Sequence, residues 1–164
     1  MIDPNKFSSD FIVHVATLAG TQIVADELTA LESWFRVEIP SMLIGNGLSR
    51  EMLLFNYKYP LNPKSKADLC LHNQIVFELK CFSRTGDSNK KNAYPGQIAM
   101  LRDHVIRKQI CQAICFTTFA GYKDTNLKKM IVQFWPAANG WTHSGPHDLL
   151  PGSRLKFLVS EFHV

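Results

Sequence analysis

Apolar and polar residues alternate most clearly along residues 66–82. The odd-numbered positions are apolar: Ala67, Leu69, Leu71, Ile75, Phe77, Leu79 and Cys81. The even-numbered positions include four polar or charged residues: Asp68, His72, Glu78 and Lys80. Because successive side chains of a strand point to opposite faces, this pattern predicts a hairpin of strands 66–71 and 75–82. One face is expected to pack on a core and the other to carry charge.

The length of the hairpin loop decides which residues face each other. With residues 72–74 as a three-residue loop, Leu69 pairs with Phe77 and Asp68 lies opposite Glu78. Directly opposed Cβ atoms lie about 4.5–5.5 Å apart. A two-residue loop would send the two acids to opposite faces, and the uniform apolar face argues against that register.

Weaker periodicities predict the remaining elements. Before the hairpin we expect a helix at 8–19, a helix at 21–38 that breaks near Pro40, and a strand at 51–59. After the hairpin we expect a polar loop at 83–92, a helix at 95–109, a strand at 113–119 and a short helix capped by Asp124 or Thr125. An irregular stretch at 136–153 and a last strand through Leu155, Phe157 and Val159 complete the prediction. This order predicts an α/β sandwich with a mixed sheet.

Composition adds few constraints. The 164 residues, 46% hydrophobic and 20% charged, suit a single domain over 1–164 and exclude disorder of the whole chain. No apolar run is long enough to span a membrane, and the first residues lack a signal-peptide pattern, so we expect no membrane partner and a cytoplasmic location. The four cysteines form no CxxC pair and are expected to be reduced. The net charge of +4 permits a polyanionic partner without requiring one.

The predicted juxtaposition of Asp68 and Glu78 suggests metal chemistry. Opposed carboxylates destabilise a sheet unless something compensates for their charge, and Mg²⁺ is commonly held by one or two carboxylates together with waters and phosphate oxygens. Lys80 lies two residues beyond Glu78 on the same face, where it can orient or help to deprotonate an attacking water. The alternative is a solvated sheet face, on which Glu-x-Lys is common.

At these residues the chain resembles the PD-(D/E)XK nuclease superfamily, which has the restriction-endonuclease-like fold. The resemblance rests on Asp68 within 66–71 and on Glu78-Leu79-Lys80 within 75–82, and it covers roughly residues 21–120. It implies an α/β/α sandwich with a central mixed β-sheet. Ala67 stands where the motif has its proline, a loose position that leaves the chemistry intact.

The resemblance also implies a set of roles. Asp68, Glu78 and the backbone carbonyl of Leu79 would hold Mg²⁺ or Mn²⁺, and Lys80 would act on the attacking water. Members often add a glutamate from the first helix, here Glu32 or, as second choice, Glu38. A solvated helix face explains both glutamates equally well.

Some members carry a glutamine on the helix after the Glu-x-Lys strand, and Gln97 fits that position. A solvent-facing residue of the first helical turn is the alternative. Arg84, Lys90 and Lys91 make the preceding loop basic, which suits phosphate contacts or a plain solvated connection.

These features predict a metal-dependent endonuclease that hydrolyses DNA phosphodiester bonds. A chain this small would cut two strands as a homodimer or with a larger protein partner. Two other readings remain open. The first is a catalytically inactive nucleic-acid-binding or assembly subunit on the same fold. The second is a domain in which the acids form only surface salt bridges.

Overall fold

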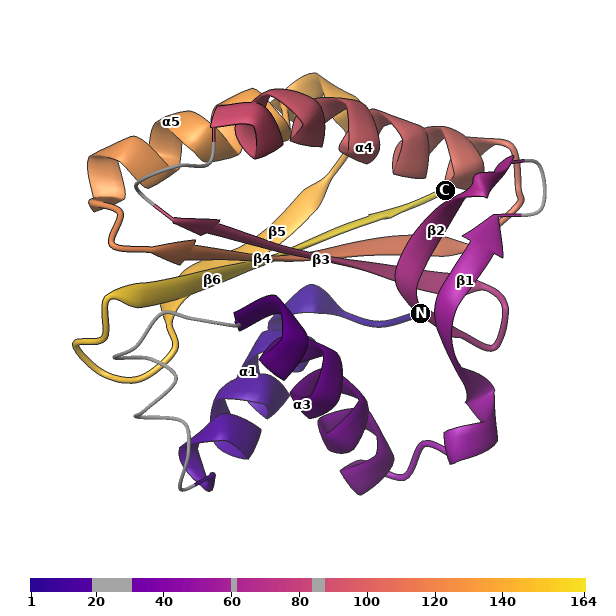
Figure 1. Ribbon diagram of the computed structural model, residues 1–164, viewed down its shortest axis with the longest axis horizontal. Coiled ribbons are helices and arrows are strands. Elements are labelled where there is room, and N and C mark those ends of the chain that lie inside the picture. The colour runs from indigo at the N-terminus through magenta and orange to yellow at the C-terminus, as the bar shows by residue number, and fades with distance from the viewer. Residues whose placement is uncertain (19–30, 60–61, 84–87) are drawn as a thin grey trace.

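A six-stranded mixed sheet divides the molecule (Figure 1). The computed structural model describes residues 1–18, 31–59, 62–83 and 88–164. The strands are β1 (Leu53–Tyr59), β2 (Asn62–Leu71), β3 (Ile75–Ser83), β4 (Gln112–Ala120), β5 (Thr142–Asp148) and β6 (Leu155–His163). Their order across the sheet is β1-β2-β3-β4-β6-β5. Strands β3 and β4 are parallel, and the other neighbouring pairs are antiparallel.

Helices cover both faces of this sheet. Within the described residues there are four α-helices: α1 (Pro4–Ala16), α3 (Leu31–Gly45), α4 (Ser88–Ile106) and α5 (Asp124–Phe134). Helices α1 and α3 lie on one face, and α4 and α5 lie on the other (Figure 1). Two single-turn 3₁₀ helices, Arg50–Met52 and Ala137–Asn139, complete the described elements. The predicted α/β class with a mixed sheet is confirmed.

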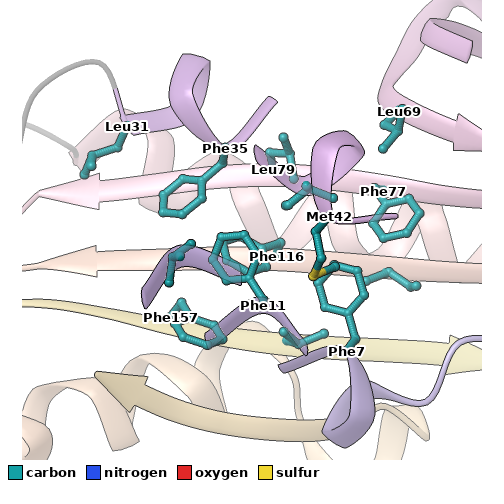
Figure 2. Packing of buried hydrophobic residues seen from close by; sticks show 14 of the residues in the cluster. Phe7, Phe11, Leu31, Phe35, Met42, Leu69, Phe77, Leu79, Phe116 and Phe157 are labelled. Carbon is teal, nitrogen blue, oxygen red and sulfur yellow. The ribbon is translucent and has the colours of Figure 1, made fainter. Parts of the chain in front are cut away.

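Aromatic side chains build the core beneath α1 and α3. Phe116 of β4 lies at its centre, with ring centroids 4.9 Å from both Phe11 of α1 and Phe35 of α3. Phe157 of β6 stacks on Phe116 at 5.3 Å. Figure 2 shows these rings filling the space between the two helices and the sheet. Four of the apolar odd positions of the hairpin belong to this core, as predicted: Leu69, Leu71, Phe77 and Leu79. Ala67, predicted on the same face, packs in the core on the opposite side of the sheet, so that part of the prediction is wrong.

The opposite face of the hairpin corrects one expectation. We predicted that this face carries charge, with a solvated face as the alternative, but it is also buried, under α4 and α5. Val76 and Phe82 of β3 pack there with Tyr94 and Ile98 of α4. The strand β4, all of whose residues are buried, has a core on each side. Its mostly apolar sequence is typical of a strand covered on both faces. Glu78 and Lys80 therefore lie within a largely covered surface.

The hairpin register is as predicted. Leu69 pairs with Phe77 and Leu71 with Ile75 around a three-residue loop. His72 and Asn73 in this loop both have positive φ, at 54° and 57°. Asparagine tolerates this left-handed conformation well, which agrees with its place in the loop.

Two helices extend beyond their predicted ends. Helix α3 continues through Pro40 to Gly45, because Ile39 and Met42 on either side are buried against the sheet and outweigh the missing N–H bond. The part of the predicted helix 21–38 before residue 31 lies outside the described residues. Helix α4 begins at Ser88, inside the stretch 83–92 predicted as a loop, and contains Pro95.

The C-terminal third contains a strand that the pattern did not predict. Residues 136–153 were expected to be irregular, yet Thr142–Asp148 forms β5, an edge strand paired with β6. Gly145 and Pro146 interrupt it, and the register shifts between Ser144 and His147. Proline and glycine are tolerated at such bulged edges.

Helix α5 begins at Asp124 with Lys123 as its N-cap residue, not Asp124 or Thr125, and no side chain caps it.

Other expectations from the composition can be compared with the structure. All four cysteines are free, with Cys70 and Cys115 buried and Cys111 exposed. In the described part of the chain, no helix combines the length and apolar character needed to cross a bilayer.

Candidate functional site

The candidate site lies where β2 and β3 separate. Among the described residues the paired ladder of the hairpin ends at Leu69 and Phe77, one residue before the predicted pairing of Asp68 with Glu78. In its place Asp68 Oδ2 accepts a hydrogen bond from the Leu79 backbone N–H at 2.8 Å. Beyond this point β1 and β2 run at a steep angle to β3 (Figure 1). A carboxylate thus takes the position that a backbone carbonyl would have in a continued ladder.

Glu78 is a largely buried acid close to this carboxylate. Its side chain is 13% exposed, and Lys80 Nζ lies 3.8 Å from its Oε1. Burial and, secondarily, the charge of Asp68 raise the pKa of Glu78 to about 7, against the lowering effect of Lys80. Because desolvation favours the neutral carboxyl, a further positive charge at this point would stabilise the ionised form.

The backbone of Leu79 also faces the site. Its N–H points toward Asp68 on β2. In an extended strand the N–H and C=O of one residue point to the same neighbour, so the Leu79 carbonyl is directed to the same side. The Leu79 side chain is buried in the core under α3, which holds the strand in this orientation.

The two candidate glutamates of the first predicted helix have different surroundings. Both lie on α3. Glu32 Oε1 is 3.7 Å from Arg36 Nη2, and its charge acts on Glu78. Glu38 instead pairs with His14 of α1, with His14 Nε2 3.0 Å from Glu38 Oε2. The geometry therefore favours Glu32 over Glu38 as a neighbour of the Asp68–Glu78 pair.

Lys80 opens onto a small cavity under the start of α4. The cavity has a volume of about 250 Å³ and is lined by Lys80, Asn89, Lys90, Ala93 and Gln97. The predicted neighbourhood of Lys80 and Gln97 is thus present.

Helix α4 is held over this point by a buried hydrogen bond. The Tyr94 hydroxyl lies 2.7 Å from Thr117 Oγ1 of β4, and Thr117 is the register partner of Lys80 across the parallel pair. The first turns of α4 therefore have a defined position above the end of β3.

The predicted basic loop contributes only in part. Arg84 lies outside the described residues. Lys90 and Lys91 belong to α4, and Lys91 Nζ lies 5.1 Å from the ring centroid of Tyr122. This geometry is that of a cation–π contact. Tyr122 in turn donates a hydrogen bond to the Ser83 carbonyl at the end of β3.

Sequence reasoning missed two residues next to the acids. Arg36 of α3 forms an ion pair with Asp68 Oδ1. Its position one turn after Glu32 was a visible signal, since residues at i and i+4 share a helix face. Tyr59 at the end of β1 is fully buried, and burial followed by the charge of Glu78 raises its pKa. No sequence pattern pointed to Tyr59.

The donor set is compatible with a hard divalent cation. In the described ranges, no three His, Cys, Asp or Glu side chains gather as a metal-binding group. Mg²⁺ needs fewer, because waters and substrate oxygens complete its octahedron. The residues that could hold it are Asp68, Glu78 and the Leu79 carbonyl. All are oxygen donors, and Lys80 Nζ lies 3.8 Å from Glu78 Oε1.

Comparisons with known proteins add no relationship. A scan against protein-family models, and searches of curated proteins and of solved structures, gave no match for this chain.

Proposed function

We propose that this chain is a metal-dependent nuclease that hydrolyses DNA phosphodiester bonds on a restriction-endonuclease-like α/β/α sandwich. One observation carries the proposal. The buried Glu78, with a pKa of about 7, lies beside both Asp68 and Lys80 where the hairpin opens. A purely structural site would more readily keep such acids in solvent, because buried carboxylates without full compensation are costly.

Each residue has a role in this proposal. Asp68 and Glu78, with the Leu79 carbonyl, hold Mg²⁺ or Mn²⁺. When bound, the cation lowers the pKa of water and neutralises the scissile phosphate. The Lys80 ammonium, held near Glu78, orients the attacking water and stabilises the charge that develops on the phosphate oxygens. Gln97, across the cavity from Lys80, positions the water or a phosphate oxygen.

DNA is the proposed partner. The cavity beside Lys80 carries a second lysine and two amides in Asn89 and Gln97. Such a lining suits a phosphate oxygen better than an apolar ligand. Cleavage of both strands of a duplex would require a second copy of the chain or a larger protein partner.

Plasmid cleavage tests the proposal directly. Supercoiled DNA is incubated with Mg²⁺ or Mn²⁺ and with wild type, Lys80→Ala or Lys66→Ala; Lys66 is an exposed lysine of β2. We expect wild type and Lys66→Ala to nick the plasmid and Lys80→Ala to be slower by about 10² or more. Absence of cleavage by wild type with either metal, or equal rates for Lys80→Ala, would contradict the proposal.

A second candidate function is a catalytically inactive nucleic-acid-binding or assembly subunit. The ion pair between Arg36 and Asp68 favours it, because a guanidinium already compensates one of the two acids. Calorimetric titration with Mn²⁺ separates the two functions. If the chain is a nuclease, the wild-type protein binds Mn²⁺ and the Asp68→Ala variant does not. An inactive subunit of this kind shows no Mn²⁺ binding.

The third reading, in which the acids form only surface salt bridges, has less support. The side chain of Asp68 is 11% exposed, close to the 13% of Glu78. Neither acid therefore lies on a solvated face.

A further inference from the structure

Arg36 has a position that the proposed mechanism does not use. A single guanidinium nitrogen, Nη2, pairs with Asp68 Oδ1 and lies 3.7 Å from Glu32 Oε1. These are two of the three acids around the site. Arg36 reaches them from α3, whereas Asp68 comes from β2. The guanidinium thus links the helix to the open end of the hairpin.

Both oxygens of Asp68 are engaged in this arrangement. Oδ1 accepts from Arg36, and Oδ2 accepts from the Leu79 N–H. The backbone bond belongs to the strand and holds the carboxylate in place. The oxygen that faces away from the backbone, and that a cation would need, is the one paired with Arg36.

We propose that Arg36 competes with the divalent cation for Asp68, so that metal binding requires its guanidinium to leave this carboxylate. This inference rests on the proposed nuclease function. A guanidinium and a divalent cation at one carboxylate oxygen repel each other at short range. The charge-assisted hydrogen bond to Arg36 is therefore lost when the metal is gained.

The side chain of Arg36 is able to move. It is 43% exposed, in contrast to the largely buried Asp68, so solvent can take over its hydrogen bonds. Glu32 lies one helical turn before it and remains as an alternative partner. Release from Asp68 therefore requires a change in one exposed side chain and leaves the fold of α3 and β2 as it is.

Calorimetric titration with Mn²⁺ of the metal-free full chain tests this inference. Three proteins are compared: wild type, Arg36→Gln and Arg107→Gln. Arg107 is the matched control, because it forms an i,i+4 ion pair with Asp103 on the exposed side of α4. Since a hydrogen bond to a charged group is worth roughly a tenfold change in affinity or more, Arg36→Gln should bind Mn²⁺ about tenfold more tightly than wild type. Arg107→Gln, just beyond the end of α4, should match wild type.

The outcomes separate this inference from the proposed function. Equal or weaker Mn²⁺ binding by Arg36→Gln than by wild type would overturn the competition and leave the nuclease proposal in place. Binding by Arg36→Gln alone would support the competition, and the absence of Mn²⁺ binding by wild type would contradict the nuclease proposal. No binding by any of the three proteins would overturn both proposals.

A second variant of Arg36 tests the competition in case Arg36→Gln does not fold. Arg36→Lys keeps the positive charge but loses the guanidinium, whose hydrogen bonding a lysine ammonium does not reproduce, so its Mn²⁺ affinity should fall between those of wild type and Arg36→Gln. The rise in melting temperature on adding Mn²⁺ reports the same order without an activity assay. An Arg36→Lys variant that binds Mn²⁺ more weakly than wild type would also overturn the competition.

Discussion

The carboxylate of Asp68 accepts the backbone N–H of Leu79 at 2.8 Å, across the point where β2 and β3 stop pairing. This bond connects Asp68 to Leu79, the residue that lies between Glu78 and Lys80 in the sequence. It makes the separation of the strands tolerable, because the Leu79 N–H would otherwise lose its partner. The same bond gives Asp68 a structural role in addition to any role in metal binding.

Two substitutions at Asp68 should separate these roles. Asp68→Ala removes the acceptor of the Leu79 N–H and should lower the free energy of unfolding by about 1–3 kcal/mol. Asp68→Asn keeps an acceptor oxygen and should be less destabilising. Both should lose Mn²⁺ binding. Urea unfolding and calorimetry measure the two effects, and equal stability of Asp68→Ala and wild type would contradict the structural role.

Glu78 should make the metal-free protein less stable as the pH rises. Its carboxyl binds a proton more tightly in the folded state, where the pKa is about 7, than at its ordinary value of 4.5. The folded state therefore holds more protons in this interval, and its stability falls as the pH rises from the lower to the upper value. Over this pH interval the free energy of unfolding should fall by up to about 3 kcal/mol, because a shift of one pKa unit corresponds to about 1.36 kcal/mol.

Glu78→Gln removes this titration and gives the measurement. Between about pH 5 and pH 8, its stability relative to wild type should rise by up to about 3 kcal/mol in urea unfolding without metal. Asp103→Asn, which changes an exposed acid of α4, is the control and should keep the wild-type profile. Parallel profiles for Glu78→Gln and wild type would show that Glu78 is not titrating in this range.

Gln97 should affect cleavage and leave metal binding unchanged. It lines the cavity beside Lys80. In Gln97→Ala the water or phosphate loses a positioning group, so the cleavage rate should fall by about tenfold. The Mn²⁺ affinity of this variant should equal that of wild type. Gln133→Ala, an exposed glutamine of α5, is the matched control. If Gln97→Ala cleaves at the rate of Gln133→Ala, the residue has no part in the reaction.

Phe116 should be among the most sensitive core positions. It contacts rings of α1, α3 and β6 and is 1% exposed. Truncation to alanine should lower the free energy of unfolding by about 3–5 kcal/mol. Val132→Ala, at an exposed position of α5, should change it by less than about 0.5 kcal/mol. Thermal or urea unfolding of both variants checks the contrast.

Some of this structure could be predicted from local pattern. The hairpin register near the loop followed from the alternation of residues 66–82, because a one-residue slip would turn the apolar side chains of one face to the other. The buried strand β4 followed from its mostly apolar sequence. The cavity that brings Gln97 near Lys80 agrees with the placement of a helix directly after the hairpin.

Other features could not be predicted in this way. Strand β5 has no apolar alternation, and pairing with β6 creates it. The continuation of α3 through Pro40 depends on burial against the sheet, which local propensity does not contain. The burial of the even face of the hairpin could not be predicted locally, because the helices that cover it, α4 and α5, come later in the chain.

The sequence by itself determined the hairpin and its register from Leu69 and Phe77 to the loop, since strand periodicity and a short loop are local properties of the chain. Only the tertiary structure decided how buried Glu78 is, and that the guanidinium of Arg36 pairs with Asp68. Both depend on elements separated by tens of residues, whose packing sets the desolvation and the charge around each group.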